Sequence, residues 1–313
     1  MNTTKRSVNW LKENLANSER LPYEALYKSP LALYLSNAKD ASLSMINQMK
    51  DRGDLFYYSD DFTTNRNCDD YYNYWLFLYF YFSKNDLKET TYNKILQNFN
   101  EDNGGFSCKN GESLYETRST AFSGICAYLN NDILIGEKTS NFLISNFVTN
   151  QTKNHFYMIR YKNNEYVTKY PEKFARLYDF YDNDGSPLYY AFSLAVINLA
   201  IGYLKTNEIK YLEYAEKYYN IIISIGDQAI FNNYIGKFGI ASNLLYIITE
   251  NTIYQEYCEK VEIYLQDSQL ELGCWEDYAS NNILSLDRTS EFTASIHMMK
   301  LIRKMDIKKL SIR

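Results

Sequence analysis

Two similar segments of this chain each carry an arginine that could bind an anion. Arg118-Ser-Thr-Ala-Phe-Ser and Arg288-Thr-Ser-Glu-Phe-Thr match closely by residue class, and each follows an aromatic turn residue, Phe106 or Trp275. Each arginine is expected to open a helix. A guanidinium group can donate two hydrogen bonds at once to a carboxylate or phosphate. We therefore predict that both arginines face one cavity and bind the anionic part of a substrate.

The same segments also allow a structural interpretation. Glu116, Asp287 and Glu291 lie close to the two arginines in sequence, and ion pairs with them would lock neighbouring helices together. Trp275, at the turn before the second segment, is a further candidate for contact with substrate. A histidine near the middle of the last predicted helix, His297, is expected to be a core residue rather than a catalytic one.

Four aspartates stand just before predicted helices. Asp69 and Asp70 precede an aromatic-rich helix, and Asp182 and Asp184 precede a later apolar one. A carboxylate at such a place can transfer a proton, or it can simply cap the helix. Asp69 and Asp70 could also hold Mg²⁺ brought in by a diphosphate, although no other cofactor is expected. Glu291 adds a carboxylate at the same predicted rim.

Composition excludes several classes of function. The net charge of -5 disfavours a nucleic-acid partner, which requires a basic face. Two histidines, and five cysteines without a C-x-x-C pair, do not predict a protein-held zinc site. The apolar run from Tyr71 to Phe82 is too short to span a bilayer, and no secretory signal is recognisable. A cytoplasmic protein with a small hydrophobic or anionic ligand is expected, while the oligomeric state stays open.

The elements that must position these side chains are helices. Apolar residues recur at helical spacing, and long alternating strand patterns are missing. The predicted helices are 41–50, 70–83, 89–98, 118–129, 137–149, 187–205, 209–224, 238–249, 253–266 and 288–304, after a first helix near Trp10 and another from Pro30.

Two kinds of helix alternate along the chain. Segments such as Tyr74-Trp-Leu-Phe-Leu-Tyr-Phe are apolar all round, whereas partners such as Tyr211-Leu-Glu-Tyr-Ala-Glu-Lys are amphipathic. A helix that is apolar on every side must be buried, and an amphipathic one faces water on one side. This alternation predicts an all-α fold: a single α/α-toroid domain over residues 1–313, with an inner and an outer ring made of five to six helical hairpins.

A degenerate turn motif supports the same architecture. Its best copy is Gln269-Leu-Glu-Leu-Gly273-Cys-Trp275, and weaker copies centre on Gly53, Gly104 and His155. These three centres are equally spaced along the chain, as expected for an array of structural repeats.

This Q-x-x-x-G-x-W turn resembles the QW motif of the terpenoid cyclases, α/α toroids whose superfamily includes the protein prenyltransferase β subunits. The resemblance implies that Gln269 fixes helix ends and that Trp275 packs on the neighbouring repeat. It also implies an enzyme of class II type, in which an aspartate of a D-x-D-D segment protonates a prenyl substrate in an aromatic cavity. Asp182-Asn-Asp184-Gly matches that segment in part, so Asp184 would be the acid, assisted by Asp182.

Two other functions remain open. Carbohydrate-active α/α barrels, which include lyases, hydrolases and epimerases, share the same outline. An enzyme of that kind acting on an anionic glycan needs two carboxylates across a cleft, and Asp69 or Asp70 with Asp184 or Glu291 could provide them. The third alternative is a non-catalytic toroid that binds a peptide or lipid.

Overall fold

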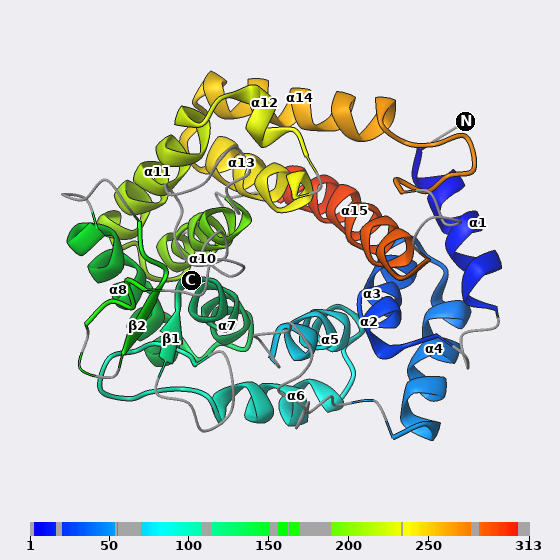
Figure 1. The fold of residues 1–313 in the computed structure, drawn as a ribbon, viewed down its shortest axis with the longest axis horizontal. Helices are drawn as coiled ribbons and strands as arrows, with labels where there is room; N and C mark the ends of the chain where they lie inside the picture. The colour runs from blue at the N-terminus through cyan, green and yellow to red at the C-terminus, as the bar shows by residue number, and fades with distance from the viewer. Residues whose placement is uncertain are drawn as a thin grey trace.

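The computed structural model describes residues 3–16, 21–53, 55, 70–107, 114–150, 156–161, 163, 165–169, 189–232, 234–276 and 282–305. In this part of the chain, helices form two concentric layers (Figure 1). The inner helices are α3 (Ser29–Leu35), α5 (Asp70–Ser83), α7 (Thr117–Leu129), α10 (Tyr190–Thr206), α13 (Ile235–Thr249) and α15 (Asn282–Arg303). The outer helices are α1 (Thr3–Leu15), α4 (Lys39–Asp51), α6 (Leu87–Leu96), α8 (Ile133–Asn150), α11 (Ile209–Ser224) and α14 (Thr252–Asp267).

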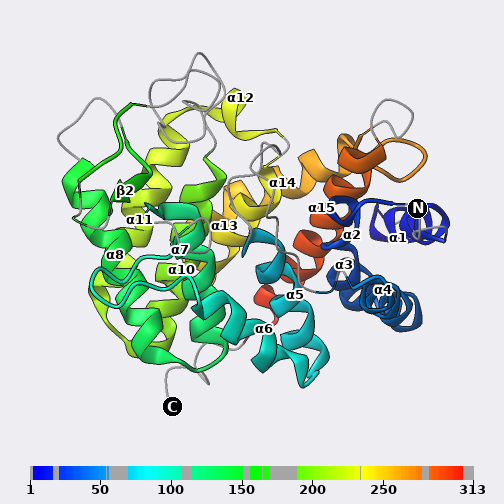
Figure 2. The ribbon, with the colours of Figure 1, turned by 60° about the horizontal axis from the view of Figure 1, so that its bottom comes forward.

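The inner helices make a closed ring. Each packs on the next in chain order, and α15 packs back on α3, the first of them (Figure 1). An oblique view shows α1, α3 and α15 side by side at this closure (Figure 2). The predicted all-α toroid is therefore confirmed, and its inner ring holds six helices in the described residues. The remaining elements are short: α2 (Tyr23–Leu26), α12 (Asp227–Ile230), and strands β1 (Leu114–Glu116) and β2 (Ile159–Tyr161), which pair antiparallel.

Burial explains which helix goes to which layer. In α13 every residue from Ile235 to Leu245 is buried, as expected for a helix with neighbours on all sides. In α14 the buried residues are Tyr254, Cys258, Val261 and Leu265, which form one stripe at helical spacing. The apolar and amphipathic classes seen in the sequence thus become the inner and outer layers.

Two glycines of the turn motif let their turns pack closely against the next outer helix, whereas Gly53 has positive φ but no such neighbour among the described residues. Gly104 and Gly273 both have positive φ, which favours glycine. A Cβ at Gly104 would lie 2.5 Å from the carbonyl oxygen of Lys138 on α8, and one at Gly273 would lie 2.6 Å from that of Arg6 on α1. The turn that closes the ring therefore uses the same close backbone contact as a turn within it.

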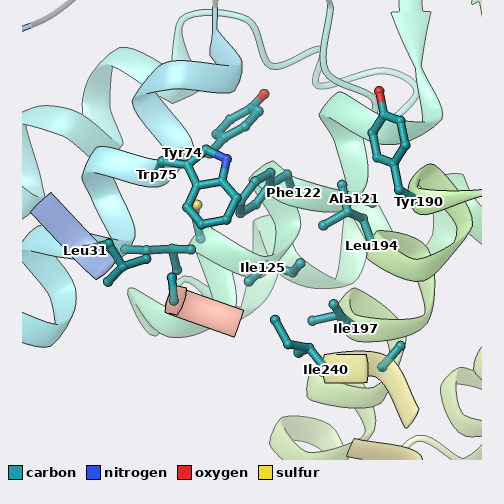
Figure 3. Close-up of a cluster of buried hydrophobic side chains, with 14 of the residues drawn as sticks. Leu31, Tyr74, Trp75, Ala121, Phe122, Ile125, Tyr190, Leu194, Ile197 and Ile240 are labelled. Atoms are coloured by element: carbon teal, nitrogen blue, oxygen red, sulfur yellow. The ribbon is translucent and has the colours of Figure 1, made fainter. Parts of the chain in front are cut away.

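Apolar side chains fill the interior of the inner ring. Leu31, Trp75, Phe122, Ile197 and Ile240 come from five different inner helices and converge in one buried cluster (Figure 3). These residues lie within about the first two turns of their helices. These apolar contacts between different inner helices hold the ring together from within.

Helix starts differ from the sequence-based prediction in two places that affect the site. The inner helix α13 begins at Ile235 rather than at Phe238, so it includes Lys237. We predicted that Arg288 opens the last inner helix, but α15 begins at Asn282, so Arg288 lies in its second turn. The prediction was wrong because it took the helix start from the match with the Arg118 segment, whereas Ile283, Leu284 and Leu286 already belong to the helix before Arg288. None of the helices that the structure describes is long and apolar enough to cross a lipid bilayer.

Candidate functional site

All six inner helices contribute to one cavity at their N-terminal ends. Its volume is about 280 Å³, and each helix supplies at least one lining residue at or near its start. In chain order these include Lys28 before α3, Tyr71 on α5, Arg118 on α7, Tyr190 on α10, Lys237 on α13 and Arg288 on α15. Unpaired backbone N–H groups and the positive ends of the helix dipoles gather at such a place, which favours an anionic ligand.

A buried ion cluster forms one wall of the cavity. Nζ of Lys28 lies 2.8 Å from Oδ2 of Asp287 and 2.5 Å from Oε2 of Glu291. Lys237 bonds the other carboxylate oxygen of Glu291. The side chains of both lysines are only 4% exposed, and that of Glu291 is 7% exposed. Glu291 therefore bridges two ammonium groups that are shielded from bulk water.

Glu291 and Lys28 hold each other in their ionised forms. Burial alone would raise the pKa of Glu291, but Lys237 and Lys28 outweigh it and lower that pKa to about 2. Burial would likewise favour neutral Lys28, yet the carboxylates of Asp287 and Glu291 raise its pKa. Glu291 thus carries no proton near neutral pH and cannot serve as the general acid of this cavity.

Aromatic rings surround the two ammonium groups. Nζ of Lys28 lies 5.3 Å from the centroid of Trp75 and 5.6 Å from that of Tyr71. Nζ of Lys237 lies 5.2 Å from the centroid of Tyr190 and 5.7 Å from that of Trp75. At these distances the rings attract the lysine charges, so the aromatic faces next to the cluster already have cations as neighbours.

Arg118 is positioned by the start of α7. Glu116 caps this helix by accepting hydrogen bonds from the backbone N–H and the hydroxyl of Ser119, and it also accepts one from Nε of Arg118 at 3.2 Å. Nη1 of Arg118 donates to the hydroxyl of Tyr190 at 2.8 Å. Burial raises the pKa of Tyr190 to about 12, so this hydroxyl keeps its proton and can donate it in a hydrogen bond.

Arg288 reaches the same cavity from α15 and pairs with Glu276. Burial lowers the pKa of its guanidinium. Neither Glu116 nor Glu276 lines the cavity. The surface that a ligand meets consequently presents four cationic side chains, those of Lys28, Lys237 and the two arginines, against the carboxylates of Asp287 and Glu291.

The structure brings only some of the predicted site residues together. Arg118, Arg288 and Glu291 line the one cavity. Trp275 does not: its ring packs edge-on against Phe292 at 5.5 Å, and its Nε1 donates to the carbonyl oxygen of Leu265. The structure thus gives Trp275 a packing role at the end of α14, in place of the predicted contact with substrate.

The predicted aspartates cannot be placed at the site. Asp69, Asp182 and Asp184 lie outside the described residues, and so does the side chain of Asp70, whose backbone begins α5. Within the part of the chain that the structure describes, no three His, Cys, Asp or Glu side chains gather as a metal site would require.

Sequence reasoning missed the two lysines of the ion cluster. Lys237 is the sole charged residue of α13, Ile-Gly-Lys-Phe-Gly-Ile-Ala-Ser-Asn-Leu-Leu-Tyr-Ile-Ile-Thr. A charge in a helix that is buried on all sides has to be paired or functional. That pattern was the available signal for Lys237. Lys28 stands alone before Ser29-Pro30 and gave no comparable signal.

His297 gives a prediction on pH dependence. It is partly buried on α15, and Nε2 has no hydrogen-bond partner among the described residues. Burial, helped by Lys300, lowers its pKa from 6.5 to about 4. As the pH falls, His297 therefore becomes protonated in the unfolded chain at a higher pH than in the folded one. The stability due to neutral His297 consequently falls as the pH drops from about 6.5 towards 4.

Urea titrations at pH 7.5 and pH 5 will measure this effect. The wild type should lose more free energy of unfolding between the two values than His297→Gln does. The difference stays below the roughly 1.4 kcal/mol per pH unit of one full proton, because the imidazole is partly solvated. Equal losses in both proteins would contradict the lowered pKa of His297 in the folded chain.

Two of the solved structures that resemble this chain cover nearly its whole length. One is described as the crystal structure of an unsaturated glucuronyl hydrolase specific for heparin, with a TM-score of 0.64, 11% identity, and coverage of 97% of this chain and 99% of that one. The Lin0763 protein from Listeria innocua has a TM-score of 0.62 and 12% identity, over 97% of this chain and 99% of that one. At such identities the similarity concerns the fold alone. No protein-family model matches the sequence, and no curated protein matches it significantly.

These structural neighbours bear on the alternatives that the sequence left open. They support the α/α toroid but not the terpenoid cyclases, whose turn motif the sequence resembles. The fold by itself does not assign an activity, so the choice depends on the chemistry of the cavity.

Proposed function

We propose that this chain is an enzyme that cleaves a glycosidic bond next to an acidic sugar, in the cavity at the N-terminal ends of the inner helices. The observation that carries the proposal is the lining of that cavity, which combines tyrosine rings with four cationic side chains. The cations suit a carboxylate or sulfate. Tyrosines offer an apolar ring face and a hydroxyl, both of which a sugar can use.

The same lining disfavours a carbocation. A terpenoid cyclase stabilises positive charge on aromatic faces, but here the rings of Tyr71, Trp75 and Tyr190 already lie next to the ammonium groups of Lys28 and Lys237. A substrate cation in this space would meet like charges at short range. An anion would be attracted by the same groups.

Cavity size favours a terminal sugar. A volume of about 280 Å³ lies near the lower end of the roughly 300–1,000 Å³ of ordinary ligand pockets. The interior of the ring behind it is filled by the apolar cluster around Trp75 and Phe122. We therefore infer an enzyme that removes one sugar from the end of a small oligosaccharide. That the structurally similar hydrolase is specific for heparin, an acidic glycan, is consistent with this class.

The reaction needs an acid and a base or nucleophile. Among the described cavity carboxylates, Asp287 is the more accessible, with its side chain 24% exposed and held by Lys28. Glu291 is excluded as the acid by its low pKa. We propose Asp287 as one member of the pair, and Asp69, Asp70 and Asp184 stay the candidates for the other.

Incubation of the full chain with defined oligosaccharides tests the proposal. The panel holds glucuronate-terminated and galacturonate-terminated disaccharides, unsaturated disaccharides made by a heparin lyase, neutral cellobiose, and a prenyl diphosphate. We expect release of the acidic sugar, detected by mass spectrometry, and no turnover of cellobiose. Asp287→Asn should lower the rate at least about hundredfold, the usual minimum for a general acid or base. Turnover of the prenyl diphosphate alone would overturn the proposal, as would an active Asp287→Asn.

A further inference from the structure

Lys237 has hydrogen-bonding capacity that its protein neighbours do not use. An ammonium group carries three N–H donors. Glu291 is the acceptor for Lys237 among the described residues, whereas Lys28 has both Asp287 and Glu291. The side chain of Lys237 is 4% exposed and lines the cavity. A buried ammonium with donors left over favours a ligand that supplies oxygen atoms there.

The arginines of the cavity are less available to a ligand. Arg118 donates through Nε to Glu116 and through Nη1 to Tyr190. Arg288 pairs with Glu276. A ligand anion would have to compete with a carboxylate that is already in place at each arginine. At Lys237, by contrast, it would add an acceptor without displacing Glu291.

We propose that Lys237 is the residue that contacts the acidic group of the ligand, and that Glu291 is a positioning residue that fixes its ammonium at the cavity wall. This inference rests on the proposed acidic-glycan function and names the group that selects for it. It replaces the prediction from sequence that Arg118 and Arg288 make this contact. Lys28, which two carboxylates hold, has a structural role in the cluster.

The surroundings of Lys237 explain why it would select for charge. Its ammonium lies among the rings of Tyr71, Trp75 and Tyr190, where water is largely excluded. A charge-assisted hydrogen bond in such a place contributes about 1.5–3 kcal/mol. Loss of that contact corresponds to roughly ten- to hundredfold weaker binding.

Calorimetric titration with a matched pair of ligands tests the inference. The probes are a glucuronate-terminated disaccharide and the same disaccharide after reduction of its carboxyl group to an alcohol. The proteins are the wild type, Lys237→Met, the double variant Lys237→Met/Glu291→Gln, and Lys205→Met as a control for surface charge, because Lys205 is an exposed residue of α10. The double variant removes both partners of the pair, so it leaves no uncompensated buried charge if the single variant fails to fold.

We expect the wild type and Lys205→Met to prefer the acidic disaccharide. Lys237→Met and the double variant should bind it ten- to hundredfold more weakly while binding the reduced disaccharide as the wild type does. Unchanged preference in the folded Lys237 variants, with loss of preference in Arg118→Met, would overturn the role of Lys237 and leave the proposed function standing. A wild type that binds both disaccharides equally, or neither, would remove the proposed function and this inference together.

Discussion

The Glu291→Gln variant will lose roughly 3–5 kcal/mol of unfolding free energy, the cost of removing one partner from a buried ion pair. Glu291 is the shared counter-ion of Lys28 and Lys237, and all three side chains are at most 7% exposed. A glutamine in its place keeps the shape but leaves Lys237 without its carboxylate. Urea titration followed by circular dichroism measures the change, provided that the slope with urea stays constant.

An exposed ion pair supplies the control. Asp227 and Lys260 lie 2.8 Å apart with side chains 49% and 45% exposed. The same carboxylate-to-amide change at Asp227 should cost about 0–1 kcal/mol, because water screens the pair. Equal effects of the two substitutions would show that burial does not strengthen the Glu291 cluster.

The stability measured at acidic pH tests the same ion cluster in a second way. Because folding lowers the pKa of Glu291 from 4.5 to about 2, its stabilising effect is present above pH 4.5 and is lost as the pH falls towards 2. The stabilities of the wild type and Glu291→Gln should therefore converge over that range. A gap that stays constant down to pH 2 would contradict the assignment.

A second large loss of stability is expected when Gly124, in the middle of α7, is replaced by alanine. A Cβ there would lie 2.0 Å from Nδ2 of Asn198 and 2.2 Å from Oγ1 of Thr139. Asn198 donates to the carbonyl oxygen of Ala121 and accepts from the hydroxyl of Ser140, and it is fully buried. Gly124→Ala must displace this amide from its partners.

Helix propensity alone predicts that alanine at position 124 would raise the free energy of unfolding. Alanine is favoured over glycine inside a helix by about 1 kcal/mol. Overpacking costs about 1–3 kcal/mol, and a buried amide that loses its hydrogen bonds costs about 1–3 kcal/mol more. We therefore expect Gly124→Ala to lower the free energy of unfolding by roughly 1–5 kcal/mol.

Gly239 on α13 is the matched control. A Cβ there would meet Sδ of Met299 at 2.6 Å and Cγ1 of Val261 at 2.8 Å. The thioether end of methionine is flexible and can move aside. The Val261 methyl must also shift, but no buried hydrogen bond is lost, so Gly239→Ala should cost less than Gly124→Ala. A Gly124→Ala protein as stable as the wild type would disprove the proposed role of the Asn198 contacts.

The sequence allowed the fold to be predicted because two local signals agree. An apolar helix such as Tyr190–Thr206 followed by an amphipathic one such as Ile209–Ser224 determines which layer each must occupy. The turn glycines Gly104 and Gly273 then show where one repeat ends, because positive φ and a close backbone contact both require glycine. Both signals act over short stretches of sequence, so they can be read without knowledge of the ring.

The site could be predicted only in part because its residues meet through ring closure. Arg118 and Arg288 were found from their matched segments, yet the start of α15 at Asn282 was missed. Lys28 and Glu291 are partners 263 positions apart in the chain, and no local pattern connects them. The charge state of Glu291 likewise depends on Lys237, which a reading of one helix at a time cannot supply.

The contacts that close the ring have a consequence for synthesis of the chain. Lys28 bonds Asp287 and Glu291, the hydroxyl of Ser29 lies 2.8 Å from that of Ser290, and the hydroxyl of Thr293 donates to Ser7. None of these bonds can form before α15 has left the ribosome. Until then Lys28 and Lys237 lack their counter-ion, and the apolar sides of α3 and α13 that later meet α15 stay open to chaperones and proteases. A chain that ends before α15 therefore lacks Asp287, Arg288 and Glu291 and cannot complete the cavity.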